Sequence, residues 1–258
     1  MSSPSDLTPT QPLQGLHMRG TVTRRFLVTY PVPPEVLVAA VPPGGELVLH
    51  NGLAWVSACF VNIANMRPSV VPEALGMNFN YLIHRTLARL PYPDGKPRST
   101  VLVLEANINR RLLGAIARNM TGVRFRIRDI SLTDSGDSWV IRMKEREEVL
   151  YEVEIYKHSI GVKTDERSHF KSASEADDFL LGISFGAQWE PEAGRIKLLA
   201  ETHDPWQTYV GDCKTSRHAL LNSLGVQQIR ADHVITMTDI PHYFALRGMA
   251  MPCPVQLR

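Results

Sequence analysis

Alternating apolar and polar positions mark two neighbouring stretches of the chain, NFNYLIHRTLARL (78–90) and STVLVLEA (99–106). Successive side chains of a β-strand point to opposite faces, so this pattern predicts two strands joined by a Pro-Tyr-Pro-Asp-Gly turn. One face of the first strand would carry Phe79, Tyr81, Ile83, Arg85 and Leu87, and one face of the second Val101, Val103 and Glu105. A charge on an apolar face is costly unless it is paired or hydrogen-bonded. We therefore expect Arg85, together with Glu105, to mark the centre of a ligand pocket in a β-barrel.

Apolar runs predict further strands at 24–30, 123–132, 138–144 and 148–157. A short helix is expected from Pro34 through Val41, because proline is tolerated in a first turn. The pair Asn51-Gly52 between apolar runs predicts a hairpin, with one strand up to His50 and the next from Leu53 onward. Residues 66–77 are predicted to be a loop.

Helical spacing appears at 109–120, where Leu112, Leu113 and Ile116 recur on one side. A second helix is predicted at 172–182, with Ser172 or Ser174 at its start and Gly182 at its end, and a third around 216–224. Many antiparallel strands with few helices predict a mainly β (α+β) fold, built as a barrel or a sandwich. The Ser/Pro-rich residues 1–16 are expected to form a flexible tail, and residues 17–258 a single domain.

The composition is that of a globular protein. Of the 258 residues 44% are hydrophobic and 21% charged, which is ordinary for a globular protein, and the net charge of +2 gives no reason to expect nucleic-acid or membrane binding. Three widely spaced cysteines without a CxxC motif suit a reducing compartment. With neither a signal-peptide pattern nor an apolar run of eighteen residues in the sequence, a cytoplasmic location is expected. Exposed strand edges leave homo-oligomerisation open.

The order of several short motifs resembles one known family. These motifs are PPEVLVAAVPPGGELVLHNGLAWVSACFVNIANMRP (33–68), IHRT (83–86), VLVLEA (101–106), a helix followed by a basic strand, and HDPWQ (203–207). In this order they resemble the YqjF-like branch (domain of unknown function 2071) of the acetoacetate decarboxylase-like superfamily, over roughly residues 20–245. The resemblance implies a cone-like antiparallel β-barrel with flanking helices and an internal small-molecule pocket. Arg85 would match the family's Arg-Thr motif, Glu105 the acidic residue that closes its strand, and His203, Pro205 and Trp206 its His-x-Pro-Trp.

One departure from the family concerns its chemistry. The founding decarboxylases form a Schiff base through a lysine whose pKa is lowered by a neighbouring cation. That lysine is expected shortly after the Glu105 strand, but no lysine occurs between Lys96 and Lys144. The arginines in this interval cannot replace it, because a guanidinium is not deprotonated in proteins. Tyr81 also stands where the family often has a carboxylate, so we expect the fold to carry over without Schiff-base decarboxylation.

The predicted ligand is a small anionic or carbonyl-bearing organic molecule, with no cofactor. Arg85 would anchor it, Tyr81 would donate a hydrogen bond, and Glu105 would be the partner of Arg85 or a catalytic acid/base group. Trp206 would cap the pocket, with His203 or Asp204 as its polar group. A structural Arg85–Glu105 ion pair and a loop-anchoring Trp206 are the competing interpretations. A non-catalytic carrier or sensor is the alternative function.

The remaining motifs are weaker. Gly182–Gly186 matches the G-x-S-x-G pattern around Ser184, but a serine-hydrolase elbow needs a strand before it and a helix after it, and the predicted order is different. Arg124, Arg126 and Arg128 form a basic stripe, which cross-strand pairing with the glutamates of 148–157 would explain. The sequence has no HExxH, GxGxxG or P-loop motif, so neither a metal nor a nucleotide is expected. The cluster of Asp232, His233, Asp239 and His242 is interpreted as incidental.

Overall fold

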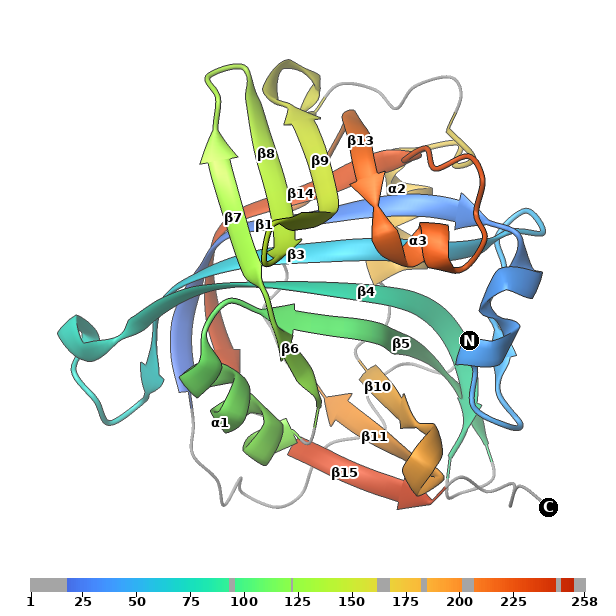
Figure 1. The fold of residues 1–258 in the computed structure, drawn as a ribbon, viewed down its shortest axis with the longest axis horizontal. Helices are drawn as coiled ribbons and strands as arrows, with labels where there is room; N and C mark the ends of the chain where they lie inside the picture. Colours follow the sequence, from blue (N-terminus) through green and yellow to red (C-terminus); the bar gives the residue numbers. More distant parts are fainter. Residues whose placement is uncertain are drawn as a thin grey trace.

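Two β-sheets and a few short helices make up the protein in the computed structural model, which describes residues 18–92, 96–121, 123–161, 168–181, 185–200, 207–244 and 247–252 (Figure 1). Within these ranges the main sheet has eleven strands and the second sheet four. The predicted mainly β fold is therefore confirmed. No helix in the described ranges is long and apolar enough to cross a membrane.

The main sheet follows the order β12-β14-β1-β3-β4-β5-β10-β11-β15, with β2 beside β4 and β6 beside β5. Its strands are β1 (Met18–Val32), β2 (Glu46–Leu47), β3 (Ala54–Pro68), β4 (Met77–Pro91), β5 (Pro97–Ile108), β6 (Phe125–Ile127), β10 (Phe185–Glu190), β11 (Arg195–Ala200), β12 (Tyr209–Gly211), β14 (His233–Phe244) and β15 (Arg247–Pro252). Neighbours are antiparallel except that β6 and β10 both run parallel to β5. The sheet is strongly curved (Figure 1), but within the described ranges it does not close into the expected barrel, because its outer strands β12 and β15 do not pair with each other.

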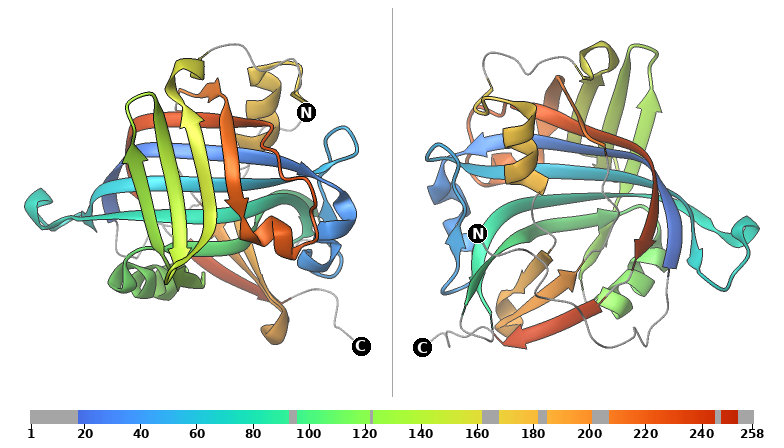
Figure 2. Two further views of the ribbon diagram at one scale, coloured as in Figure 1. Left: turned by 45° about the horizontal axis from the view of Figure 1, so that its top comes forward. Right: turned by 180° about the vertical axis from the view of Figure 1, so that it is seen from behind.

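The second sheet crosses one face of the main sheet, and a helix covers the other (Figure 2). This sheet has the order β13 (Cys213–His218), β9 (Glu148–Tyr156), β8 (Ser138–Glu145) and β7 (Asp129–Asp134). Between the sheets lies an apolar core that includes Phe26, Leu82 and Ile141. On the opposite face Ala176 and Leu180 of α2 (Ala173–Leu181) pack against a second core. The central strands are thus buried on both faces.

Short helices connect the strands largely where the sequence predicts them. They are η2 (Pro34–Ala40), η3 (Glu73–Leu75), α1 (Arg111–Thr121), η4 (Lys157–Ser159), α2, η5 (Pro191–Ala193) and α3 (Ala219–Ser223). The start of α2 is a reciprocal cap: Ser172 Oγ accepts from Glu175 N, and the Glu175 carboxylate accepts from Lys171 N. The predicted start at Ser172 is therefore confirmed.

The predicted hairpin at Asn51-Gly52 is only partly correct. The turn forms, with positive φ at both residues (53° and 76°), and a single bridge joins His50 and Leu53. The preceding strand β2, however, pairs with β4 rather than with β3. Because β1 and β4 already flank β3, no edge of β3 is open to a hairpin partner.

The single strand predicted at 123–132 is wrong in its extent. Its first part is β6, which pairs with β5 in the main sheet, and its second part is β7, which pairs with β8 in the second sheet. The chain passes from one sheet to the other at Arg128, which pairs with Glu145 of the second sheet. Arg128 therefore does not share a surface with Arg124 and Arg126, the other two arginines of the predicted basic stripe.

Candidate functional site

A β-bulge in β5 decides which side chains meet on the main sheet. His84 pairs with Glu105, whereas the next residue of β4, Arg85, pairs with Val103, so Leu104 is an extra residue. Such a bulge sets two residues of one strand against one of the other and resets the alternation of faces. Glu105 therefore shares a face with His84, and Arg85 lies with Val103 on the opposite face. The predicted pairing of Arg85 with Glu105 is wrong for this reason.

Arg85 lies on the face covered by α2 and is only 8% exposed. Its Nη2 atom donates to the carbonyl oxygen of Leu180, in the last turn of α2, at 3.2 Å. Tyr81 lies on the same face, half-buried against the core under α2. The structure thus shows Arg85 anchoring a helix, and its role as a ligand anchor stays a prediction. His203 and Trp206 lie outside the described residues.

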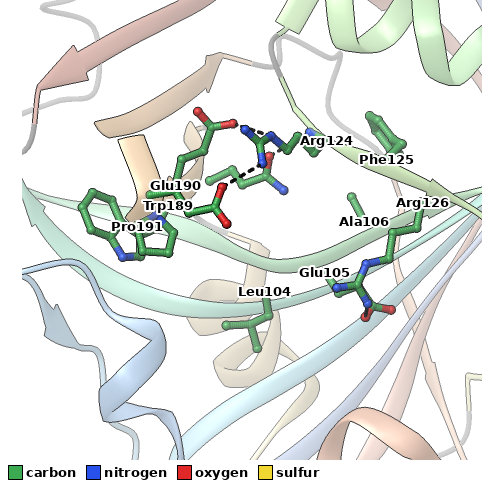
Figure 3. A pocket seen from close by; sticks show the side chains of 11 residues that line it. Leu104, Glu105, Ala106, Arg124, Phe125, Arg126, Trp189, Glu190 and Pro191 are labelled. Carbon is green, nitrogen blue, oxygen red and sulfur yellow. Dashed lines mark hydrogen bonds and ion pairs between the residues drawn. The ribbon is translucent and has the colours of Figure 1, made fainter. Parts of the chain in front are cut away.

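The edge of β5 changes partner at the bulge. Residues 101–103 pair with β10, and residues 106–108 pair with β6. Residues 104 and 105 therefore lie where β10 and β6 diverge, and we call this place the fork. A pocket of about 370 Å³ opens there (Figure 3). It is lined by Leu104, Glu105, Ala106, Arg124, Phe125, Arg126, Gln188, Trp189, Glu190, Pro191 and Glu192.

Two carboxylates in the pocket wall hold its arginines. Glu105 Oε2 accepts a hydrogen bond from Arg126 Nη1 at 2.6 Å, and its Oε1 accepts one from Asn107 Nδ2 at 2.8 Å. Glu190 Oε1 lies 3.0 Å from Arg124 Nε. Arg124 Nη1 also lies 3.8 Å from Oε2 of the exposed Glu192. The two arginine side chains remain 53% and 62% exposed, so each guanidinium can still present donors to a ligand.

Glu190 is the buried centre of a cationic cluster. It is 4% exposed and also accepts from Arg195 Nε and Lys197 Nζ, each at 2.7 Å. Burial by itself raises the pKa of this carboxyl, but the hydrogen bonds from Lys197 and Arg195 more than offset it and hold the pKa below its ordinary value. Glu190 is therefore an ionised anchor with three cationic partners.

Apolar side chains complete the pocket. Figure 3 shows Trp189 beside Pro191 on one side and Phe125 on the other, with Leu104 below them. Ligand sites commonly combine such apolar walls with a few converging polar groups. The pocket at the fork has this composition.

Two buried histidines lie behind Glu105, between the sheets. His84 is 1% exposed, its Nδ1 is 4.0 Å from Glu105 Oε1, and its ring lies 4.9 Å from that of His218. Burial lowers the pKa of His84 to about 4, against the opposing effect of Glu105. Burial, and secondarily His84, lower the pKa of His218 to about 2. Both imidazoles are therefore neutral at neutral pH.

Sequence reasoning found Glu105 but assigned the pocket arginines to another surface. The ion pair between Arg142 and Glu152 confirms cross-strand pairing on the second sheet. Arg124 and Arg126, by contrast, pair with Glu190 and Glu105. The alternation of arginine with Phe125 and Ile127 could have indicated a charged strand at a pocket. It could not identify the partner of Arg124, because β10, which carries Glu190, was not predicted as a strand.

The other candidate sites gain no support from the described residues. Ser184 lies outside them, and the elements that flank it, α2 before and β10 after, have the reverse order of a nucleophile elbow. Across the described ranges no three His, Cys, Asp or Glu side chains are grouped to hold a metal ion. Asp232 instead accepts from Ser168, His169 and His233, which ties residues 168–170 to the start of β14.

Several solved structures share this architecture, among them acetoacetate decarboxylases. Acetoacetate decarboxylase from Legionella pneumophila aligns over 97% of this chain and 98% of its own, with a TM-score of 0.61 and 14% identity. The enduracididine biosynthesis enzyme MppR complexed with pyruvate aligns over 98% and 96%, with a TM-score of 0.60 and 13% identity. An acetoacetate decarboxylase-like enzyme from Sphingomonas wittichii RW1 aligns over 94% and 100%, with a TM-score of 0.58 and 12% identity. At these identities the matches show the fold alone: the chain has an acetoacetate decarboxylase-like fold.

The family follows from the sequence match. The model of the DUF2071 family, described as an uncharacterized conserved protein, matches residues 20–241. The chain belongs to the DUF2071 family. No curated protein matches the sequence significantly.

Proposed function

We propose that this protein binds a small organic carboxylate with an apolar or aromatic body in the pocket at the fork. The observation that carries the proposal is the presence of two half-exposed guanidiniums, Arg124 and Arg126, in a pocket with apolar walls. Guanidinium groups bind carboxylates through paired, charge-assisted hydrogen bonds. Trp189 and Phe125 would receive the apolar part of the ligand.

The charges around Glu190 support this assignment. A ligand carboxylate would compete with Glu190 for Arg124, and removing one partner from a buried charge is usually costly. Here Glu190 would still be held by Arg195 and Lys197. A ligand would also replace the looser contact of Arg124 with the exposed Glu192, at 3.8 Å, so the half-exposed Arg124 is better placed to turn toward a ligand than the buried Arg85.

The proposed chemistry excludes a Schiff base. Among the described residues that line the pocket there is no lysine, and Lys197, which lies behind it, is held by Glu190, to which its Nζ donates at 2.7 Å. A small carboxylate still suits the fold, since the structurally similar MppR is described with bound pyruvate. Glu105 is the candidate acid/base group if the bound molecule is also transformed. A carrier would bind the same class of ligand and return it unchanged.

Binding of benzoylformate, an aromatic α-keto acid, and of pyruvate tests the proposal by calorimetry and thermal shift. We expect wild-type protein to bind both, and Arg124→Ala and Arg126→Ala each to lose about tenfold or more in affinity, because hydrogen bonds to charged groups contribute about 1.5–3 kcal/mol. Arg142→Ala is the matched control, because Arg142 is similarly exposed and paired with a glutamate, but on the second sheet. Equal affinities in all four proteins would refute the site.

A further inference from the structure

Glu105 faces two environments at once. Its Oε2 meets Arg126 in the pocket, and its Oε1 faces Nδ1 of His84 at 4.0 Å in the interior between the sheets. Neither ring nitrogen of His84 has a hydrogen-bond partner among the described residues, although the side chain is almost fully buried. Buried polar atoms without partners are rare in proteins, and a catalytic role or a bound water can account for them. His84 thus lies within reach of the pocket through Glu105.

The groups around His84 leave Glu105 as its charged neighbour. Tyr151 of β9 and His218 of β13 pack against the His84 ring. The Tyr151 hydroxyl is bonded to that of Tyr30, and His218 Nδ1 accepts from Leu221 N. Within the described part of the chain, the carboxylate at 4.0 Å is the ionised group that acts on His84. A proton arriving on His84 would therefore be stabilised by Glu105.

We propose that Glu105 and His84 act as one proton-holding pair, and that an anion bound at Arg126 is taken up together with a proton from solvent onto this pair. This inference rests on the proposed function. An anion beside Arg126 places a second negative charge near Glu105, and like charges favour the protonated form of a site. His84 is a positioning residue here, since it acts through Glu105 and does not touch the ligand.

The burial of His84 sets the pH range of the effect. Its pKa of about 4 leaves the pair without the extra proton at neutral pH. An anion in the pocket raises the proton affinity of the pair, and by reciprocity a proton on the pair raises the affinity for the anion. Affinity for a permanently ionised carboxylate should therefore increase as the pH is lowered from 7 toward 5.

The test follows the nine histidine side chains of the full-length protein by NMR between about pH 4 and pH 7, with His84→Gln to assign the His84 signal. We expect Glu105→Gln to lower the pKa of His84, because it removes the negative neighbour. We expect benzoylformate, which stays ionised in this range, to raise that pKa in the wild type and to have a smaller effect in Glu105→Gln. An unchanged His84 titration in Glu105→Gln would overturn the pair, whether or not any ligand binds.

Calorimetry at pH 5 gives a second measurement that needs no complete titration. Binding enthalpies of benzoylformate in two buffers of different ionisation enthalpy give the number of protons taken up. Uptake in the wild type that decreases in His84→Gln supports the pair, and binding without proton uptake overturns it. If the wild type binds no benzoylformate, the proposed function fails, and the effect of Glu105→Gln on His84 alone decides whether the pair exists.

Discussion

Three arginines have different roles in this protein because their local surroundings differ. Arg85 is buried and donates to the carbonyl of Leu180, whereas Arg124 and Arg126 are half-exposed and held by carboxylates in a pocket wall. The period-two pattern correctly placed Arg85 on an apolar face. It could not show the bulge at Leu104, because one extra residue in the apolar run 101–104 is compatible with either register. Glu105 was therefore predicted as a site residue but with the wrong partner.

Replacing Arg85 should affect stability rather than binding. We expect Arg85→Ala to lower the free energy of unfolding by about 1–3 kcal/mol, because the hydrogen bond to the last turn of α2 is lost in a buried setting. Arg89→Ala, an exposed position on the same strand, should change it by less than about 0.5 kcal/mol. Urea unfolding measures both. Loss of benzoylformate binding in a still-folded Arg85→Ala protein would indicate that the ligand binds on the face under α2 and not at the fork.

Trp189 should control the preference for aromatic ligands. We expect Trp189→Ala to reduce affinity for benzoylformate by about tenfold, through loss of aromatic contact area, while affinity for pyruvate changes little. Calorimetry with both ligands gives the ratio directly. An equal loss for both ligands would mean that Trp189 supports the pocket's structure instead of contacting the ligand.

At the scale of elements, the long strands were predictable and the pieces that build the site were not. β4 follows from the alternating pattern of residues 78–90, and β5 from the apolar run at 101–104 and its flanking residues. β6 has three residues and is separated from β7 only by Arg128, so a continuous apolar pattern concealed the passage between sheets. The fork depends on β6 and β10 both pairing with β5, which is a long-range choice that local periodicity does not encode.

The free energy of unfolding should decrease in mild acid, because two histidines are buried between the sheets. His84 and His218 have folded-state pKa values of about 4 and about 2, below the value of about 6.5 for an unfolded chain. The unfolded state therefore binds more protons below pH 6.5, and stability present above that pH is lost as the pH falls. Protonation of each histidine in the unfolded state should lower the free energy of unfolding by about 2 kcal/mol between pH 7 and pH 5.

Urea unfolding at both pH values measures this loss. In His84→Gln the loss should be reduced by about half, since one of the two histidines is removed. His158→Gln is the control, because His158 is exposed in η4, and it should leave the pH dependence unchanged. A wild-type stability that is the same at pH 5 and pH 7 would contradict the buried neutral state of both histidines.

At the scale of the whole molecule, the order of motifs along the sequence correctly indicated the fold, which the alignment with acetoacetate decarboxylase-like structures confirms. The second sheet covers one face of the main sheet and α2 covers the other. Packed apolar side chains therefore occupy the space on both faces of the central strands. The pocket lined by charged side chains opens at the fork, on the edge of β5, and not on either covered face of the sheet.

The most direct test of this account is a crystal structure of the protein with benzoylformate bound. We predict that the ligand carboxylate lies within hydrogen-bonding distance of the guanidiniums of Arg124 and Arg126, with its ring against Trp189. A ligand found instead on the face under α2, with its carboxylate on Arg85, would contradict the site at the fork.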